Sequence, residues 1–165
     1  MPRRVLPKSQ NRTTERKNSS ESVVEKGRSF TVRVEGDRKP VKMHIDGGDF
    51  IRLLKNRCDY AIEVFPDAPF RAFFFVELKG EDVLKAAQQL LSTIENLNAY
   101  RHILDYTKFR KQFACIVSSK GPVPAITTRY QVIDRKIQSF GFEKLRCKTR
   151  KDIAIVRNDD SASFC

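Results

Sequence analysis

The sequence predicts an α/β protein with a mixed central β-sheet flanked by helices. Apolar and polar residues alternate along residues 30–36 and 39–45, which is typical of half-buried strands. Between residues 81 and 97 the apolar residues recur in steps of three and four, which is typical of an amphipathic helix. Residues 113–119 and 126–139 repeat this change from strand to helix. Such an order indicates helices packed against one sheet.

The first two strands are expected to form a hairpin, because Gly36-Asp37 interrupts the alternation between residues 30–36 and 39–45. Residues 46–48 (Asp-Gly-Gly) form the next turn. Asp49 is placed to cap a short helix over residues 50–54.

The next two strands, residues 58–64 and 71–80, are separated by a proline-containing loop and are close enough in sequence to pair as a hairpin. The helix over 81–97 follows directly. One apolar stripe on it consists of Val83, Ala87, Leu90, Ile94 and Leu97. After residues 126–139, whose helix ends near Gly141, residues 144–156 close the domain as one or two strands.

One domain is expected over residues 29–157, between two tails. Residues 1–28 are predicted to be a disordered basic tail with eight basic and three acidic side chains. That tail acts either as an arm that grips phosphate groups or simply as a solvated segment. Residues 158–165 are predicted to be a flexible C-terminal tail.

Charge and composition narrow the class of protein. Lysine and arginine number 32 against 20 acidic residues, so the net charge of +12 favours a polyanionic partner. No apolar run approaches the roughly 20 residues of a transmembrane helix, and no apolar stretch follows the basic N-terminus as in a secretory signal. The four cysteines form no CxxC pair, which favours reduced thiols in the cytoplasm over a zinc site.

Three charged side chains carry the predicted chemistry. Glu77 and Lys79 alternate onto one face at the end of a strand that is otherwise uncharged from Ala72 onward, and Asp59 opens the neighbouring strand. If the hairpin turns near residues 66–70, Asp59 and Glu77 can hold one divalent cation between hard oxygen ligands, with Lys79 beside a bound water. Mg²⁺ suits such a site best, with Mn²⁺ as the alternative. The other reading is an ordinary exposed ion pair at a strand end.

These residues resemble the PD-(D/E)xK nuclease superfamily, whose members share a restriction-endonuclease-like αβββαβ core and cut DNA, or less often RNA, with Mg²⁺. The resemblance covers about residues 46–119 and rests on Asp59 followed by Glu77-x-Lys79 and a helix. It implies Asp59, Glu77 and the carbonyl of Leu78 as metal ligands and Lys79 as the residue that activates water. Gln89, or its neighbour Gln88, matches a glutamine that many relatives carry.

Two points depart from the family pattern. Cys58 stands where the family name places a proline, a position that the family keeps loosely. A fourth acid, usually on a preceding helix, is not evident. Asp46 and Asp49 are candidates, and both are also explained as turn or cap residues.

Four cations in residues 144–150 alternate with Leu145, Cys147 and Thr149: Lys144, Arg146, Lys148 and Arg150. On a strand they would line one face and follow a phosphate backbone. The alternative is an edge strand whose charges prevent it from pairing with another chain and aggregating.

The sequence therefore predicts a magnesium-dependent nuclease acting on nucleic acid, DNA before RNA, with no membrane association. A homodimer or a partner protein is left open. The first alternative is a non-catalytic nucleic-acid-binding or assembly protein that retains the fold. A basic component of a ribosomal or nucleoprotein complex is the second.

Overall fold

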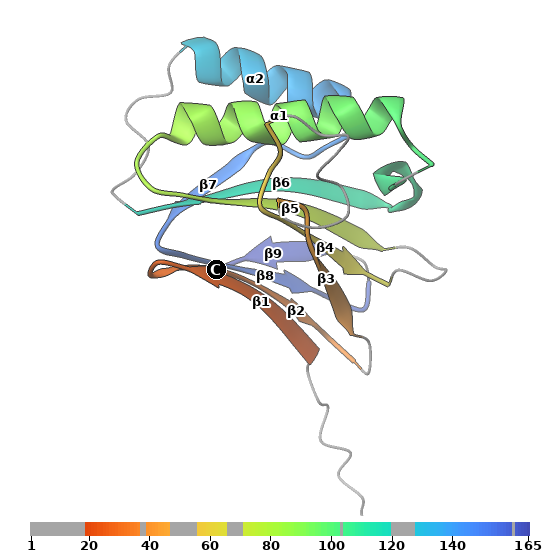
Figure 1. Ribbon diagram of the computed structural model, residues 1–165. Helices are drawn as coiled ribbons and strands as arrows, with labels where there is room; N and C mark the ends of the chain where they lie inside the picture. Colours follow the sequence, from red (N-terminus) through yellow and green to blue (C-terminus); the bar gives the residue numbers. More distant parts are fainter. Residues whose placement is uncertain are drawn as a thin grey trace, which may run out of the picture.

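Three layers make up the protein in the computed structural model, which describes residues 19–36, 39–46, 56–65, 71–102, 104–119, 128–159 and 161–165. Two helices cover one face of a five-stranded sheet, and a four-stranded sheet covers its other face (Figure 1). The elements are β1 (Ser19–Glu25), β2 (Arg28–Val34), β3 (Pro40–His44), β4 (Tyr60–Val64), β5 (Ala72–Lys79), α1 (Val83–Ala99), the 3₁₀ turn η1 (Tyr106–Lys108), β6 (Lys111–Ser118), α2 (Thr128–Ser139), β7 (Arg146–Thr149), β8 (Lys151–Val156) and β9 (Ala162–Phe164). The predicted α/β class is confirmed.

The five-stranded sheet has the order β3-β4-β5-β6-β7. β3, β4 and β5 are antiparallel neighbours, so the predicted hairpin of the third and fourth strands is confirmed. β6 and β7 run parallel to β5, because α1 and α2 return the chain to the starting edge of the sheet before each of them. β5 lies at the centre, and all its residues from Ala72 to Leu78 are buried.

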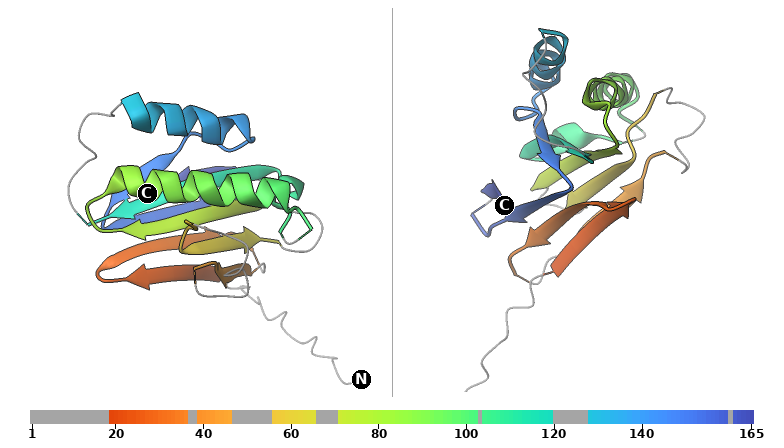
Figure 2. Two further views of the ribbon diagram at one scale, coloured as in Figure 1. Left: turned by 45° about the horizontal axis from the view of Figure 1, so that its top comes forward. Right: turned by 90° about the vertical axis from the view of Figure 1, so that its left-hand side faces the viewer.

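α1 packs its predicted apolar stripe against this sheet. Asp82 begins the helix by accepting a hydrogen bond from the backbone N–H of Lys85 at 2.9 Å. The buried helix residues lie on one face: Ala86, Ala87, Leu90, Thr93, Ile94 and Leu97. Phe73 and Phe75 of β5 point into the same core, and α2 lies beside α1 over the sheet (Figure 2).

The four-stranded sheet has the order β1-β2-β8-β9 and corrects two sequence-based predictions. β2 forms its hairpin with β1, closed by Lys26 and Gly27 at φ values of 45° and 76°, and not with β3. The predicted hairpin of residues 30–36 and 39–45 is therefore wrong, and the prediction of one sheet is wrong with it. Alternation identifies a strand, whereas its partner is chosen by long-range packing.

Both predicted tails enter this second sheet. Residues 19–25 form β1 and residues 162–164 form β9, so the boundaries at 28 and 158 are wrong. Each strand gains hydrogen bonds from a neighbour and places an apolar side chain, Val23 or Phe164, against the core between the sheets. The rest of the predicted tail (1–18), the short helix (50–54), Asp49, the loop around residues 66–69 and the turn at 121–124 lie outside the described residues.

The predicted closing segment forms two strands that belong to different sheets. The chain passes from β7 to β8 at Arg150, whose φ is 60°. Arg146 of β7 holds the two strands together, because its guanidinium donates to both carboxylate oxygens of Asp152, one of them at 2.9 Å. The Asp152 side chain is fully buried, and Arg146 also lies 4.1 Å over the ring of Phe164.

Removing the cation of this pair is expected to destabilise the protein strongly. Arg146→Met leaves the Asp152 carboxylate buried without its partner, which lowers the free energy of unfolding by about 3–5 kcal/mol. Chemical denaturation measures this loss. The double variant Arg146→Met/Asp152→Asn should recover part of the stability, and Lys148→Met, an exposed change on the same strand, should stay within about 0.5 kcal/mol of wild type.

Candidate active site

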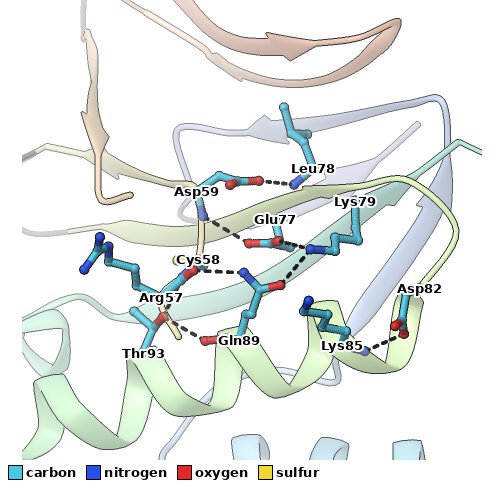
Figure 3. A network of polar contacts seen from close by, with 10 residues as sticks. All are labelled: Arg57, Cys58, Asp59, Glu77, Leu78, Lys79, Asp82, Lys85, Gln89 and Thr93. Atoms are coloured by element: carbon cyan, nitrogen blue, oxygen red, sulfur yellow. Dashed lines mark hydrogen bonds and ion pairs between the residues drawn. The ribbon is translucent and has the colours of Figure 1, made fainter. Parts of the chain in front are cut away.

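The acidic residues of the site lie where the regular pairing of β4 with β5 ends. The last paired residues are Tyr60 and Val76. At the next position the Asp59 N–H donates to Glu77 Oε2 at 3.1 Å, and the Leu78 N–H donates to Asp59 Oδ2 at 2.8 Å (Figure 3). Each carboxylate is thus fixed by the backbone of the opposite strand.

Lys79 completes the group from the same strand as Glu77. Its ammonium lies 4.0 Å from Glu77 Oε1 and donates to Gln89 Oε1 at 3.0 Å. Gln89 in turn donates through Nε2 to the carbonyl of Arg57 at 3.2 Å. The structure therefore brings together Asp59, Glu77, Lys79 and Gln89, whereas Gln88 is exposed on α1.

Thr93 belongs to this network and was missed by sequence reasoning. Its hydroxyl accepts a hydrogen bond from the Cys58 N–H at 2.7 Å and donates to the Gln89 carbonyl at 2.8 Å. Thr93 follows Gln89 by one helical turn, so the spacing was a usable signal. The contact also explains why position 58 is not a proline, because a proline there has no N–H to donate.

Burial controls the electrostatics of the two carboxyl groups. Glu77 is only 1% exposed, and its burial raises the pKa to about 8, with the neighbouring Asp59 carboxylate as the second cause. Lys79 and the hydrogen bond from the Asp59 N–H act in the opposite direction. Burial also raises the pKa of Asp59, against the lowering effect of the Leu78 N–H. Two ionised carboxylates would therefore not be fully compensated by their surroundings, so Glu77 holds a proton at neutral pH when no cation is bound.

Two further acids influence Asp59. Asp46 and Glu25 both raise its pKa by repulsion, so both lie near it. Asp46, one of the two candidates for a fourth acid, is exposed and accepts a hydrogen bond from Arg57 Nε at 2.9 Å. Glu25, at the end of β1, was not considered from the sequence, since its segment was predicted to be disordered.

Asp59 and Glu77 are the side chains that could hold a metal ion here. Within the described parts of the chain, no group of three or more histidine, cysteine, aspartate or glutamate side chains is arranged around a common metal position. Mg²⁺ commonly takes only one or two carboxylates and fills its other positions with water and phosphate oxygens. The four cysteines, Cys58, Cys115, Cys147 and Cys165, are free thiols.

The four cations of residues 144–150 do not form one strand face. β7 spans only Arg146–Thr149, so Lys144 precedes the strand and Arg150 lies in the bend after it. Lys144, Lys148 and Arg150 are exposed. Arg146 is instead paired with the buried Asp152, and its own side chain is 28% exposed. β7 is also an edge strand of its sheet, where charge guards against further pairing.

No protein-family model matches this chain, and the searches of curated proteins and of solved structures find no similar protein. None of the helices in the described residues is long and apolar enough to cross a membrane.

The pH dependence of stability is expected to report the state of Glu77. In metal-free buffer the native carboxyl keeps its proton up to about pH 8, whereas the unfolded one loses it near the ordinary value of 4.5. The stabilisation is therefore complete below the unfolded pKa and is lost as the pH rises to about 8, by up to about 1.4 kcal/mol per unit. Thermal melts should show a steeper loss between those values for wild type than for Glu77→Gln, and parallel curves would contradict this assignment.

The Thr93 hydroxyl group is expected to contribute more to the stability of the protein than the volume of the side chain does. Thr93→Val keeps the shape but leaves the buried Cys58 N–H without a partner, which lowers the free energy of unfolding by about 1–3 kcal/mol. Thr93→Ser keeps the hydroxyl and should lose less. Urea denaturation of both variants gives the comparison, and a serine variant as unstable as the valine variant would mean that packing dominates.

Proposed function

We propose that this protein is a magnesium-dependent nuclease that hydrolyses phosphodiester bonds of DNA, or alternatively of RNA, at Asp59, Glu77 and Lys79. One observation carries the proposal: the carboxylates of the buried Glu77 and the half-buried Asp59 each accept a hydrogen bond from the backbone of the other's strand, with an oriented ammonium beside them. A purely structural pair at an exposed strand end would be solvated, whereas Glu77 is almost fully buried. Buried acids with raised pKa values are typical of functional sites.

The order of elements supports the same family as the motif. β3, β4, β5, α1 and β6 follow one another as in the βββαβ part of a restriction-endonuclease-like core, with β6 parallel to β5. Asp59 opens the second of these strands and Glu77 lies near the end of the third. This agreement favours the PD-(D/E)xK superfamily over an unrelated arrangement of the three residues.

The residues of the site fit Mg²⁺. A divalent cation would compensate the two carboxylates once both are ionised, and these carboxylates with the Leu78 carbonyl would hold it. A bound Mg²⁺ neutralises the phosphate and lowers the pKa of an attacking water. Lys79 orients that water and stabilises charge developing on the phosphate oxygens, and Gln89 holds the ammonium in place. Mn²⁺ is the alternative metal.

The basic charge of the protein and its proposed place in the cell complete the proposal. The net charge of +12 and the exposed Lys144, Lys148 and Arg150 favour contacts with the phosphate backbone over direct readout of bases. Symmetric cutting of both strands requires two active sites, for which a homodimer or a partner protein would serve. The free thiols favour the cytoplasm as the place of action.

A second candidate is a non-catalytic nucleic-acid-binding or assembly protein that retains this fold. It is favoured by the presence of two carboxylates, without a third metal-binding side chain gathered beside them in the described residues. In such a protein the same charges would serve phosphate contacts alone.

Cleavage assays separate the two candidates. The purified protein is incubated with single- and double-stranded DNA and RNA in Mg²⁺, Mn²⁺ or EDTA, beside Glu77→Ala and Lys79→Ala. We expect metal-dependent cutting that both substitutions abolish, because each removes a group in contact with the reacting atoms. Unchanged binding without cutting of any substrate would reject the nuclease and leave the second candidate.

Gln89 provides a graded test of the same site. Gln89→Leu frees the Lys79 ammonium from its support and is expected to lower the cleavage rate by about 10–100-fold. Gln88→Leu makes the same change one residue away on the exposed face of α1 and should leave the rate unchanged. Equal rates for the two variants would remove Gln89 from the mechanism.

A further inference from the structure

Arg28 is a cation among the apolar residues on one face of β2. β2 turns one face toward the other sheet, and the residues on that face are Arg28, Phe30, Val32 and Val34. Arg28 is the first residue of β2, directly after the β1–β2 turn, and is only 7% exposed. Burying a guanidinium is costly unless hydrogen bonds or an opposite charge compensate it.

The guanidinium is incompletely satisfied. Within the described part of the chain, the buried Nε of Arg28 has no hydrogen-bond partner. Such a group is retained against its cost where a ligand supplies the missing partner. A phosphate oxygen is the partner that an arginine fork fits best, because the planar guanidinium can offer two N–H groups to it.

Gly80 lies beside this guanidinium. A Cβ on Gly80 would lie 3.7 Å from Arg28 Nη1 and 3.9 Å from Ser119 Oγ, so glycine leaves room at a point that both side chains face. The backbone of Gly80 is also held there, because its carbonyl accepts the Ser119 N–H at 2.8 Å. The Arg28 and Ser119 side chains therefore converge on a gap of one missing side chain, the position that a Cβ of Gly80 would take.

This gap adjoins the candidate active site. Gly80 follows Lys79 directly, and in the sheet Lys79 pairs with Ser118, which pairs with Thr149. The carboxyl ends of β5, β6 and β7 thus meet at one corner, where ligands commonly bind in sheets of this kind. Arg150 continues that corner, since its carbonyl accepts the N–H of Ser29 at 2.9 Å. The β1–β2 turn and the ends of β5 and β7 lie on the same side of the molecule (Figures 1 and 2).

We infer that Arg28, with Ser119 across the space left by Gly80, binds a phosphate of the nucleic-acid substrate next to the one that is cut. This inference rests on the proposed function and extends it. The bound strand crosses the carboxyl ends of β5, β6 and β7, from Lys79 toward Arg150. Arg28 thereby positions the substrate, and the repeating backbone phosphate, common to all sequences, is what it recognises.

Two matched variants test Arg28. Arg28→Met removes the inward cation of β2, and Arg33→Met removes an exposed cation of the same strand. Binding of labelled single-stranded and duplex DNA in EDTA is followed by fluorescence anisotropy across a salt series. Arg28→Met should weaken binding about tenfold and reduce the salt slope by about 0.7 on single strands or 0.9 on duplex, as one lost phosphate contact requires. Arg33→Met should leave the slope unchanged.

Thermal stability distinguishes binding from a structural role. An unsatisfied buried cation replaced by methionine should raise Tm, by roughly 2–4 °C, while substrate affinity falls. A structural arginine would lower Tm. If Arg28→Met does not fold, Gly80→Ala serves instead, because its methyl occupies the space at ordinary contact distance and no left-handed backbone is needed there. The alanine variant should lose affinity with Tm unchanged.

The outcomes separate this inference from the nuclease itself. If the wild type cuts DNA and Arg28→Met binds DNA with unchanged affinity, the role of Arg28 is overturned and the nuclease stands. Where Arg28→Met does not fold, the affinity of Gly80→Ala decides in the same way. An equal loss in Arg33→Met overturns it too. Arg28-dependent binding without cutting in any metal rejects the nuclease and keeps the phosphate site. A wild-type protein that binds no nucleic acid overturns both.

Discussion

Strand β5 is the element on which the rest of the structure depends, because it is buried on both faces. Phe73 and Phe75 face the helices, whereas Phe74 and Val76 face the second sheet. Such a strand must be apolar throughout its covered length, so charge can enter only where cover ends. Glu77 lies just before the strand loses its cover. Its side chain is buried, and the protein alone does not compensate the charge of its carboxylate. The chemistry proposed here follows from that placement.

The second sheet does more than complete the core. By covering β5 on the face opposite the helices, it brings the β1–β2 turn to the end of β5, where Glu25 acts on Asp59 and Arg28 reaches Gly80. The Arg146–Asp152 pair joins the two sheets across the bend between β7 and β8, so it supports the fold. Cations that are close in sequence therefore differ in role. Those that a neighbouring layer covers stabilise the fold, and those that no layer covers face solvent.

Local signals allowed much of this arrangement to be predicted. The uncharged run before Glu77 and the change of period after Gly80 predicted β5 and α1. The hairpin expected between residues 58–64 and 71–80 predicted that Asp59 and Glu77 would lie near each other. Gln89 was suggested by the family resemblance, and only the structure separates it from Gln88. Thr93 and Glu25 were missed, because their roles depend on residues that lie 34 or 35 positions away in the sequence.

The sequence by itself determined the class, the central strand, both helices and the motif residues, since periodicity and charge act over short distances along the chain. Only the tertiary structure decided that there are two sheets, that β2 pairs with β1 and β8, and that residues 19–25 and 162–164 are ordered. These features arise from hydrogen bonds and burial that a partner strand supplies, and a polar strand such as β1 shows little of this in its own composition. For the same reason the buried position of Arg28 was invisible until β2 was placed against β5.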